Sequence, residues 1–325
     1  MSLDTAQRGH RVSAQDLQSV IEAAVWAPSI HNTQPWWFGT RDTGSGPVIS
    51  LHADTERRLN VADPDGREMM ISCGAALATL SLAIRHRGYE PEVRPQSDPD
   101  RPALLADVGF GRSARPTEEV EQAYEQIRLR RTHRGAFKDA PVGAQVLAAL
   151  SVAAERETVR LSVALSHERV ALGALTEAAE QVQLLDPAHL AEAARRYSVR
   201  LRALEQSDPY SSARDFVRGQ GWGNAKSGTH GVTGVVVVLA TPGDGRHDWL
   251  AAGQALQRVL LRASAAGLSA AFHTQALEVP ELREFIHTRL CRGGHPQMLM
   301  RLGVADNDLT STRRSVDQVR NEELS

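Results

Sequence analysis

The sequence predicts an α+β fold in which two related halves are fused in one chain. Residues 12–17 resemble residues 142–147 as the opening of an amphipathic helix. Farther along, residues 74–88 resemble residues 253–267, which span an equal length and also end in a glycine. Because helices and short strands follow each match in the same order, we expect two copies of one α+β unit, packed together as a pseudo-dimer.

The first expected helix begins at Ser13, where Ser13 and Asp16 form a capping box ahead of apolar residues at helical spacing. Pro28 ends this helix. Gly88 and Gly267 close the two later helices and are typical of a left-handed helix terminus. A strand-like run that leads into a glycine then follows in each copy, at residues 104–109 and 298–303.

The two halves are expected at residues 1–115 and 116–325, with an insertion in the second half at about residues 168–231. The insertion opens with helical patterns around residues 172–182 and 190–201. It ends at residues 207–231, where apolar residues follow no regular helix or strand period. This stretch contains several glycines together with Tyr210, Phe216 and Trp222. Long stretches of this kind are lids, binding segments or surface loops, and the sequence leaves these alternatives open.

Composition argues against several kinds of partner. Among 325 residues, 37 Lys plus Arg nearly balance 39 Asp plus Glu. The protein therefore has no overall positive electrostatic field that would favour nucleic-acid binding. The longest apolar run, residues 235–240, has the length of a strand, and the first residues contain no signal-peptide core. We therefore expect a cytoplasmic protein with no membrane or nucleic-acid partner, in which Cys73 and Cys291 are reduced thiols.

Neither a metal site nor a dinucleotide-binding fingerprint is predicted. His287, Cys291 and His295 recur every four residues, but Gly293 and Gly294 interrupt any helix that would align them as ligands. The sequence contains no G-x-G-x-x-G and no P-loop pattern. Any nicotinamide cofactor is therefore expected to bind transiently.

Residues 27–38 form the first candidate binding segment. Two prolines fix the backbone around short polar side chains that can donate and accept hydrogen bonds. A capped helix end that runs into an aromatic strand is the alternative interpretation. The candidate ligand-binding residues here are Pro28, Ser29, His31, Asn32 and Gln34.

A cluster of basic residues at the end of a helix forms the second candidate segment. Guanidinium groups bind phosphate oxygens in a bidentate manner, and a threonine hydroxyl adds a further donor. A solvated basic helix end is the alternative. The candidates are Arg130, Arg131, Thr132 and Arg134, and a further basic pair, Arg313 and Arg314, is by itself typical of tail charge.

Together these motifs resemble the nitroreductase family. The segment Ala27-Pro28-Ser29-x-x-Asn32-x-Gln34-Pro35-Trp36 is similar to the flavin-binding loop of that family, and Arg130-Arg131-Thr132-x-Arg134 is similar to its phosphate-binding motif. The order of the fused halves is most similar to the Acg family of actinobacterial nitroreductase-like proteins. The resemblance extends over roughly residues 13–319.

The resemblance implies one FMN per chain, held between the two halves. Arg130, Arg131, Thr132 and Arg134 would bind its phosphate and ribityl chain, and Arg313 or Arg314 would close the phosphate from the tail. Ser29, Asn32 and Gln34, with Pro28 and His31 in the same loop, would meet the ring edge or the ribityl hydroxyls. The segment that contains His273 and Thr274 would lie against the isoalloxazine near N5. His31 and His133 would flank the flavin as candidate proton donors, although a hydrogen-bonding role is favoured for His133.

The mirror-image flavin site is expected to be lost. The first half has only Arg8 and Arg11 before its first helix, and the second half has Glu157-Thr158-Val159 where Pro-Ser would stand. A fused chain of this kind is expected to act as a monomeric pseudo-dimer rather than as an obligate dimer.

The implied activity is NAD(P)H-dependent oxidoreduction, with hydride transfer through FMN to a nitroaromatic or quinone-like acceptor in a ping-pong cycle. No catalytic side chain is assigned. The alternative function is a lidded protein that sequesters FMN or senses redox state with little turnover, in which Tyr210, Phe216 and Trp222 occupy the position where a substrate would stack.

Overall fold

The computed structural model describes residues 12–44, 46–96, 98–133, 137–194, 234–305 and 312–322. Several sequence-based expectations lie outside this part of the chain. They concern Arg8, Arg11, Arg134 and residues 207–231 with their three aromatic side chains.

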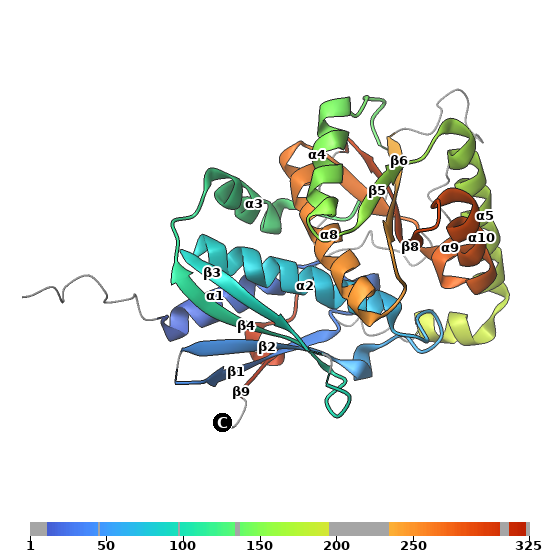
Figure 1. The fold of residues 1–325 in the computed structure, drawn as a ribbon. Coiled ribbons are helices and arrows are strands. Elements are labelled where there is room, and N and C mark those ends of the chain that lie inside the picture. The colour runs from blue at the N-terminus through green and yellow to red at the C-terminus, as the bar shows by residue number, and fades with distance from the viewer. Residues whose placement is uncertain are drawn as a thin grey trace, which may run out of the picture.

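The first part of the chain folds into helices that alternate with a set of antiparallel strands (Figure 1). Its elements are α1 (Ala14–Ala24), η1 (Ile30–Asn32), β1 (Trp36–Asp42), β2 (Pro47–Ala53), η2 (Thr55–Arg57), α2 (Arg67–His86), β3 (Tyr89–Pro95) and β4 (Leu104–Ser113).

The remainder repeats this alternation with more helices. Its elements are α3 (Glu118–Leu129), α4 (Ala144–Glu155), β5 (Arg160–Val163), α5 (Ser166–Leu185), β6 (Val235–Thr241), α8 (Arg246–Ala265), β7 (Ser269–Phe272), α9 (Gln275–Glu278), α10 (Pro280–Leu290), β8 (His295–Gly303), η3 (Val316–Gln318) and β9 (Arg320–Glu322). The predicted strands at residues 104–109 and 298–303 are parts of β4 and β8.

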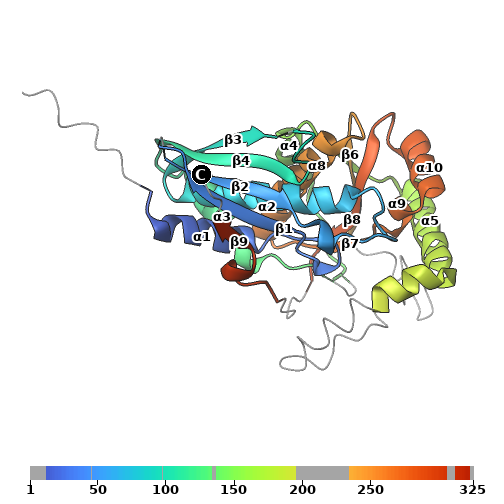
Figure 2. The same ribbon diagram turned by 90° about the horizontal axis from the view of Figure 1, so that it is seen from below.

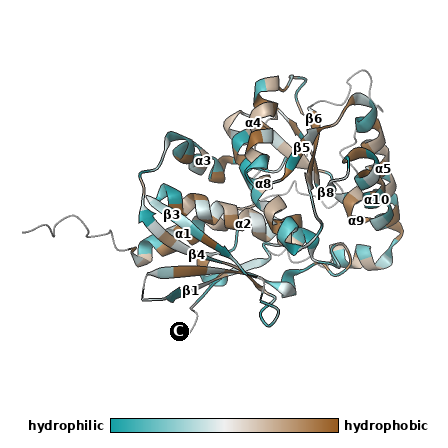
Figure 3. Cartoon of the chain, in the orientation of Figure 1, coloured by the Kyte–Doolittle hydropathy of each residue, from teal (hydrophilic) through white to brown (hydrophobic). Residues whose placement is uncertain are grey.

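The strands form two separate sheets, which confirms the α+β prediction (Figure 2). One is five-stranded in the order β3-β4-β2-β1-β9, and the other is four-stranded in the order β5-β6-β8-β7. Hydrophobic residues run along α2 and through the strands (Figure 3). α2 has the length and hydropathy of a membrane span, but most of it is buried inside the protein, as in the core helix of a globular domain.

The two halves meet where α2 crosses α8, and the contact is reciprocal. A Cβ atom placed on Gly74 would lie 2.1 Å from the Leu250 carbonyl oxygen, and one placed on Gly253 would lie 2.0 Å from the Ile71 carbonyl oxygen. Ile71 and Leu250 each precede the glycine of their own helix by the same number of residues. Equivalent residues that contact one another in this way define an isologous interface, so the fused two-half arrangement is confirmed.

The helix ends agree with the sequence prediction. The Ser13 hydroxyl accepts a hydrogen bond from Asp16 N at 3.1 Å, which completes the predicted capping box at α1. Gly88 and Gly267 adopt φ values of 84° and 73°, which only glycine adopts readily. α2 and α8 begin before the glycines that matched in the sequence, so Gly74 and Gly253 mark the helix crossing and not the helix starts.

The end of the chain returns to the first sheet, which the sequence analysis did not predict. β9 pairs in parallel with β1, and Phe38 N donates a hydrogen bond to the Val319 carbonyl oxygen at 2.6 Å. Val319, directly before β9, is buried in the hydrophobic core of the first half. A segment from the second half of the sequence therefore completes the sheet of the first half, while the boundary at residues 115–116 remains a prediction.

Helix α5 occupies the predicted start of the insertion. Its Leu172 and Ala179 are buried against β6, α9 and α10. Cys73 and Cys291 are free, buried thiols, and burial raises the pKa of the Cys291 thiol to about 11.

Candidate functional site

The loop that follows α1 has a strained backbone. His31, Asn32 and Gln34 adopt φ values of 45°, 58° and 48°, a region that costs roughly 1 to 3 kcal/mol for a residue with a side chain. Hydrogen bonds hold the loop in this form, since Ser29 Oγ accepts from Gln34 N at 2.9 Å and Ser72 Oγ on α2 accepts from Ile30 N at 3.1 Å. Strain of this kind concentrates at functional sites.

The two tail arginines bind this loop directly. Arg313 Nη1 donates to Asn32 Oδ1 at 3.1 Å, and the main-chain N of Arg314 donates to Gln34 Oε1 at 2.9 Å. The Arg314 side chain also donates to the carbonyl oxygens of Gln34 and Trp36. The structure therefore brings Arg313 and Arg314 together with the loop. The two arginines are part of the candidate site and not only solvated charges near the end of the chain.

Arg130 lies at the centre of the basic cluster. The residue is 4% exposed, and its Nε and Nη1 atoms have no hydrogen-bond partner among the residues that the structure describes. Burial, together with the charges of Arg313 and Arg131, lowers the pKa of Arg130 to about 9. Because a buried charge without a partner is costly, the three arginines form a site that an anion would stabilise.

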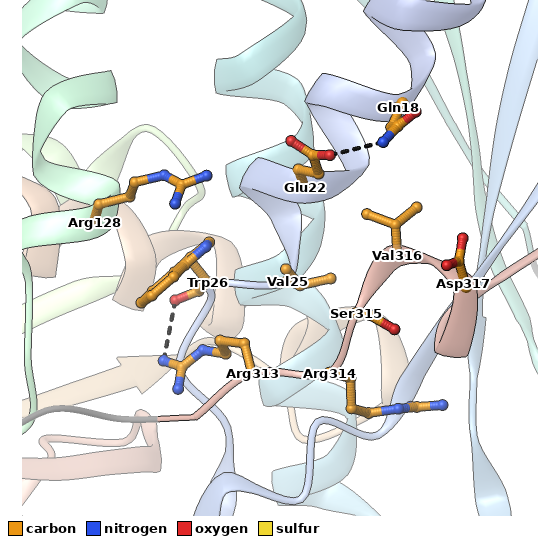
Figure 4. A pocket seen from close by; sticks show the side chains of 10 residues that line it. All are labelled: Gln18, Glu22, Val25, Trp26, Arg128, Arg313, Arg314, Ser315, Val316 and Asp317. Carbon is orange, nitrogen blue, oxygen red and sulfur yellow. Dashed lines mark hydrogen bonds between the residues drawn. The ribbon is translucent and has the colours of Figure 1, made fainter. Parts of the chain in front are cut away.

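Trp26 connects the arginines to one another. The guanidinium carbons of Arg128 and Arg131 each lie 5.2 Å from its ring centroid, and that of Arg313 lies 5.3 Å away. Arg313 Nη2 also donates to the Trp26 carbonyl oxygen (Figure 4). The sequence analysis missed Trp26, although its position directly before Ala27-Pro28 was a usable signal.

A cavity of about 360 Å³ opens beside Trp26 (Figure 4). Arg128, Arg313 and Arg314 contribute its basic side, and Glu22 and Asp317 contribute acidic groups. Burial and the charge of Arg131 lower the pKa of Arg313 to about 10. Arg313 therefore belongs both to this cavity and to the Arg130 cluster.

The arginine segment is attached to the edge of the second sheet. Thr132 forms a parallel bridge with Ala270 of β7, and His133 N donates to the Ala270 carbonyl oxygen at 2.8 Å. The chain continues from β7 into His273 and Thr274, so the main chain brings these predicted residues to the same edge as Thr132. The His133 ring packs against Phe137, with 4.8 Å between the centroids.

The side chains of His273 and Thr274 are engaged inside the second half. Arg301 Nε donates to His273 Nε2 at 3.1 Å, and burial with the Arg301 charge lowers the pKa of His273 to about 3. The imidazole is therefore neutral, with its proton on Nδ1. Thr274 Oγ1 donates to Glu278 Oε1 at 2.9 Å. Only the main chain of this segment is left to meet a ligand without breaking these bonds.

Comparison with known proteins identifies the family, although no family model matches the chain. It is 32% identical over 329 residues to the Mycobacterium tuberculosis protein named "Putative NAD(P)H nitroreductase Rv3131", covering 97% of this chain and 93% of the relative. It is 29% identical over 330 residues to the protein of the same organism named "Putative NAD(P)H nitroreductase acg", covering 95% of this chain and 96% of the relative. The chain belongs to the nitroreductase family.

Solved structures of nitroreductases also match the chain. One is an FMN and NADPH-dependent nitroreductase, NfnB from sphigopyxis sp. strain HMH, at 19% identity and a TM-score of 0.45, covering 62% of this chain and 99% of that protein. Another is the FMN-dependent nitroreductase NfnB from Mycobacterium smegmatis in complex with NADPH, at 16% identity and a TM-score of 0.39, covering 64% of this chain and 96% of that protein.

Proposed function

We propose that the chain binds one FMN and acts as an NAD(P)H-dependent oxidoreductase of the nitroreductase type. The observation that carries this proposal is the buried Arg130 guanidinium beside Arg131 and Arg313, two of whose donor atoms find no partner in the described part of the chain. A phosphate monoester supplies the acceptor oxygens and the negative charge that such a cluster lacks. The names of the mycobacterial relatives support the same activity.

In this proposal the phosphate binds Arg130, Arg131, Thr132, Arg134 and Arg313. Arg314 fixes Gln34, while Pro28, Ser29, His31, Asn32 and Gln34 form the strained loop toward the ring and the ribityl chain. The main chain of residues 270–274 would lie against the flavin on the side opposite the strained loop. FMN bound there would accept a hydride from NAD(P)H and pass it to a small nitroaromatic or quinone-like acceptor.

One FMN per chain is part of the proposal, because the position equivalent to the Pro28 loop has a different structure. There Glu157 accepts a hydrogen bond from Arg258 Nε at 2.6 Å, and the buried Val159 leads directly into β5. The connection from α4, which ends at Glu155, to β5, which begins at Arg160, is much shorter than the connection from α1 to β1 that contains the polar loop of the first half. We further propose a monomeric pseudo-dimer in the cytoplasm, where buried free thiols such as Cys73 persist.

Anaerobic stopped-flow mixing of the yellow protein with NADPH and with NADH tests the activity. We expect at least one of them to bleach the flavin absorbance rapidly, and a quinone added afterwards to restore it. If neither nucleotide bleaches a flavin that dithionite still reduces, the reductase proposal is wrong and an FMN store or redox sensor replaces it.

A further inference from the structure

The cavity beside Trp26 adjoins the buried arginine cluster but is separate from it. Its lining includes Arg128 and Arg313, and neither Arg130 nor Arg131 belongs to it. Arg313 is the shared residue, because it lines the cavity and its charge also acts on Arg130. A phosphate bound at Arg130 would therefore not occupy the cavity, which remains available to a second ligand.

Arg128 is the uncommitted cation of this cavity. It is exposed near the end of α3, and its guanidinium carbon lies 5.2 Å from the Trp26 ring centroid. It forms no hydrogen bond or ion pair with any residue that the structure describes. Figure 4 shows its guanidinium at the side of the cavity formed by Trp26 and Arg313. Its N–H groups are therefore available for bidentate binding of a phosphate.

The rest of the lining suits a purine nucleoside. Val25, Trp26 and Val316 give the cavity an apolar wall, and its volume of about 360 Å³ lies in the range of small-molecule sites. Glu22 accepts a hydrogen bond from Gln18 at 2.9 Å, and its carboxylate has further capacity to accept one from the amino group of adenine.

The acidic groups leave one side of the cavity for a phosphate. Asp317 lies across the cavity from Arg128 (Figure 4). A negatively charged ligand group is repelled by the Asp317 carboxylate and attracted by the Arg128 guanidinium. A nucleotide in this cavity would therefore place its phosphate at Arg128 and its base against the apolar wall.

We propose that the cavity binds the adenosine 2′-phosphate end of NADPH, and that Arg128 is the residue that selects NADPH over NADH. This inference rests on the proposed function and names the nucleotide that it uses. NADPH differs from NADH only in the 2′-phosphate, which a guanidinium recognises. Arg313 Nη1 bonds Asn32 of the strained loop, so a dinucleotide anchored in the cavity lies beside the loop proposed to meet the flavin.

Nucleotide fragments test the site on the FMN-loaded protein without turnover. In that form the Arg130 cluster holds the FMN phosphate, so a further phosphate must bind elsewhere. Adenosine 2′,5′-bisphosphate carries the 2′-phosphate, and adenosine 5′-monophosphate lacks it. By calorimetry we expect the bisphosphate to bind about 10-fold more tightly, as one charge-assisted contact at an exposed position allows. This preference should disappear in Arg128→Gln and should decrease as the salt concentration rises.

Flavin reduction supplies a second readout. In anaerobic stopped-flow mixing with Arg128→Gln, the Kd of NADPH should rise about 10-fold, while the Kd of NADH stays the same. The limiting bleaching rate at saturation should not change with either nucleotide, because Arg128 would contact the 2′-phosphate and not the flavin. Arg128→Lys keeps the charge without the planar fork and should retain part of the preference.

Arg289→Gln is the matched control. It removes the same charge from an exposed position of α10. Figure 1 shows α10 at the opposite end of the molecule from α1 and α3, which border the cavity. This variant should keep the wild-type preference for the bisphosphate and for NADPH. An equal loss of preference in both variants would show that overall charge sets it, and would overturn the assignment of Arg128.

The outcomes distinguish this inference from the proposed function. If NADPH bleaches the flavin but Arg128→Gln keeps the preference for the 2′-phosphate, or if the wild type binds both fragments equally, the inference is wrong. Bisphosphate that binds only the flavin-free protein, and that FMN displaces, occupies the Arg130 cluster and also contradicts it. If neither nucleotide bleaches the wild-type flavin, the proposed function fails, and the fragment titration still decides whether the cavity binds a 2′-phosphate.

Discussion

Replacing Arg130 with methionine will abolish FMN retention and, at the same time, raise the unfolding temperature of the flavin-free protein. The guanidinium is buried beside the charges of Arg131 and Arg313, and no described residue bonds its Nε or Nη1 atom. Methionine fills similar space without a charge, and exchanges of this kind at buried ionic sites stabilise proteins by about 2 kcal/mol. In a protein of this size that corresponds to an increase of about 3 °C.

The same exchange removes the charge-assisted hydrogen bonds to the phosphate. Their loss should weaken FMN binding by about 3 kcal/mol, roughly a 100-fold increase in Kd. The double variant Arg130→Ala, Arg134→Ala should purify colourless. Thermal unfolding with and without FMN measures both effects, and Arg85→Met, at an exposed arginine of α2, is the control in which neither changes. A yellow Arg130→Met protein, or one less stable without flavin, would overturn the site assignment.

Gly253→Ala should destabilise the protein by more than about 3 kcal/mol, because the new Cβ atom forces the two central helices apart. That atom would lie 2.0 Å from the Ile71 carbonyl oxygen and 2.8 Å from the Gly74 Cα atom, and backbone atoms cannot yield as a flexible side chain can. Gly74→Ala should behave alike, and the double variant should fall short of the sum because the two positions touch.

Chemical denaturation measures this effect against a matched glycine. Gly143 has φ −64° and an added Cβ atom there would meet nothing within 4 Å, so Gly143→Ala should change stability by less than about 1 kcal/mol. Equal stabilities for Gly253→Ala and Gly143→Ala would show that the helix crossing does not hold the two halves at the spacing described here.

The internal repeat carried most of the fold prediction. Gly74 and Gly253 occupy equivalent positions because the two related helices approach each other closely there. This close approach can be recognised in the sequence from the matching glycines. The return of β9 to the first sheet was not predictable in the same way. It depends on main-chain pairing of three residues with β1, and such short pairing has no pattern of side chains to reveal it.

The candidate site was predicted in part. The loop and the arginine motif stand out because Pro, Ser, Asn, Gln and Arg occur there in a definite order. The burial of Glu68 was missed, since Glu68 directly follows Arg67 at a helix start and that pattern is typical of a solvated helix end. This end of the helix is packed inside the protein, so that Glu68 is only 3% exposed. The role of Arg134 remains a prediction, as it lies outside the described residues.

Calorimetric titration of the flavin-free protein with FMN and with riboflavin tests the central claim most directly. The account predicts one FMN per chain, and riboflavin, which lacks the phosphate, should bind roughly 100-fold more weakly because the Arg130 cluster then stays unpaired. Two FMN per chain, or equal affinities for the two flavins, would contradict it.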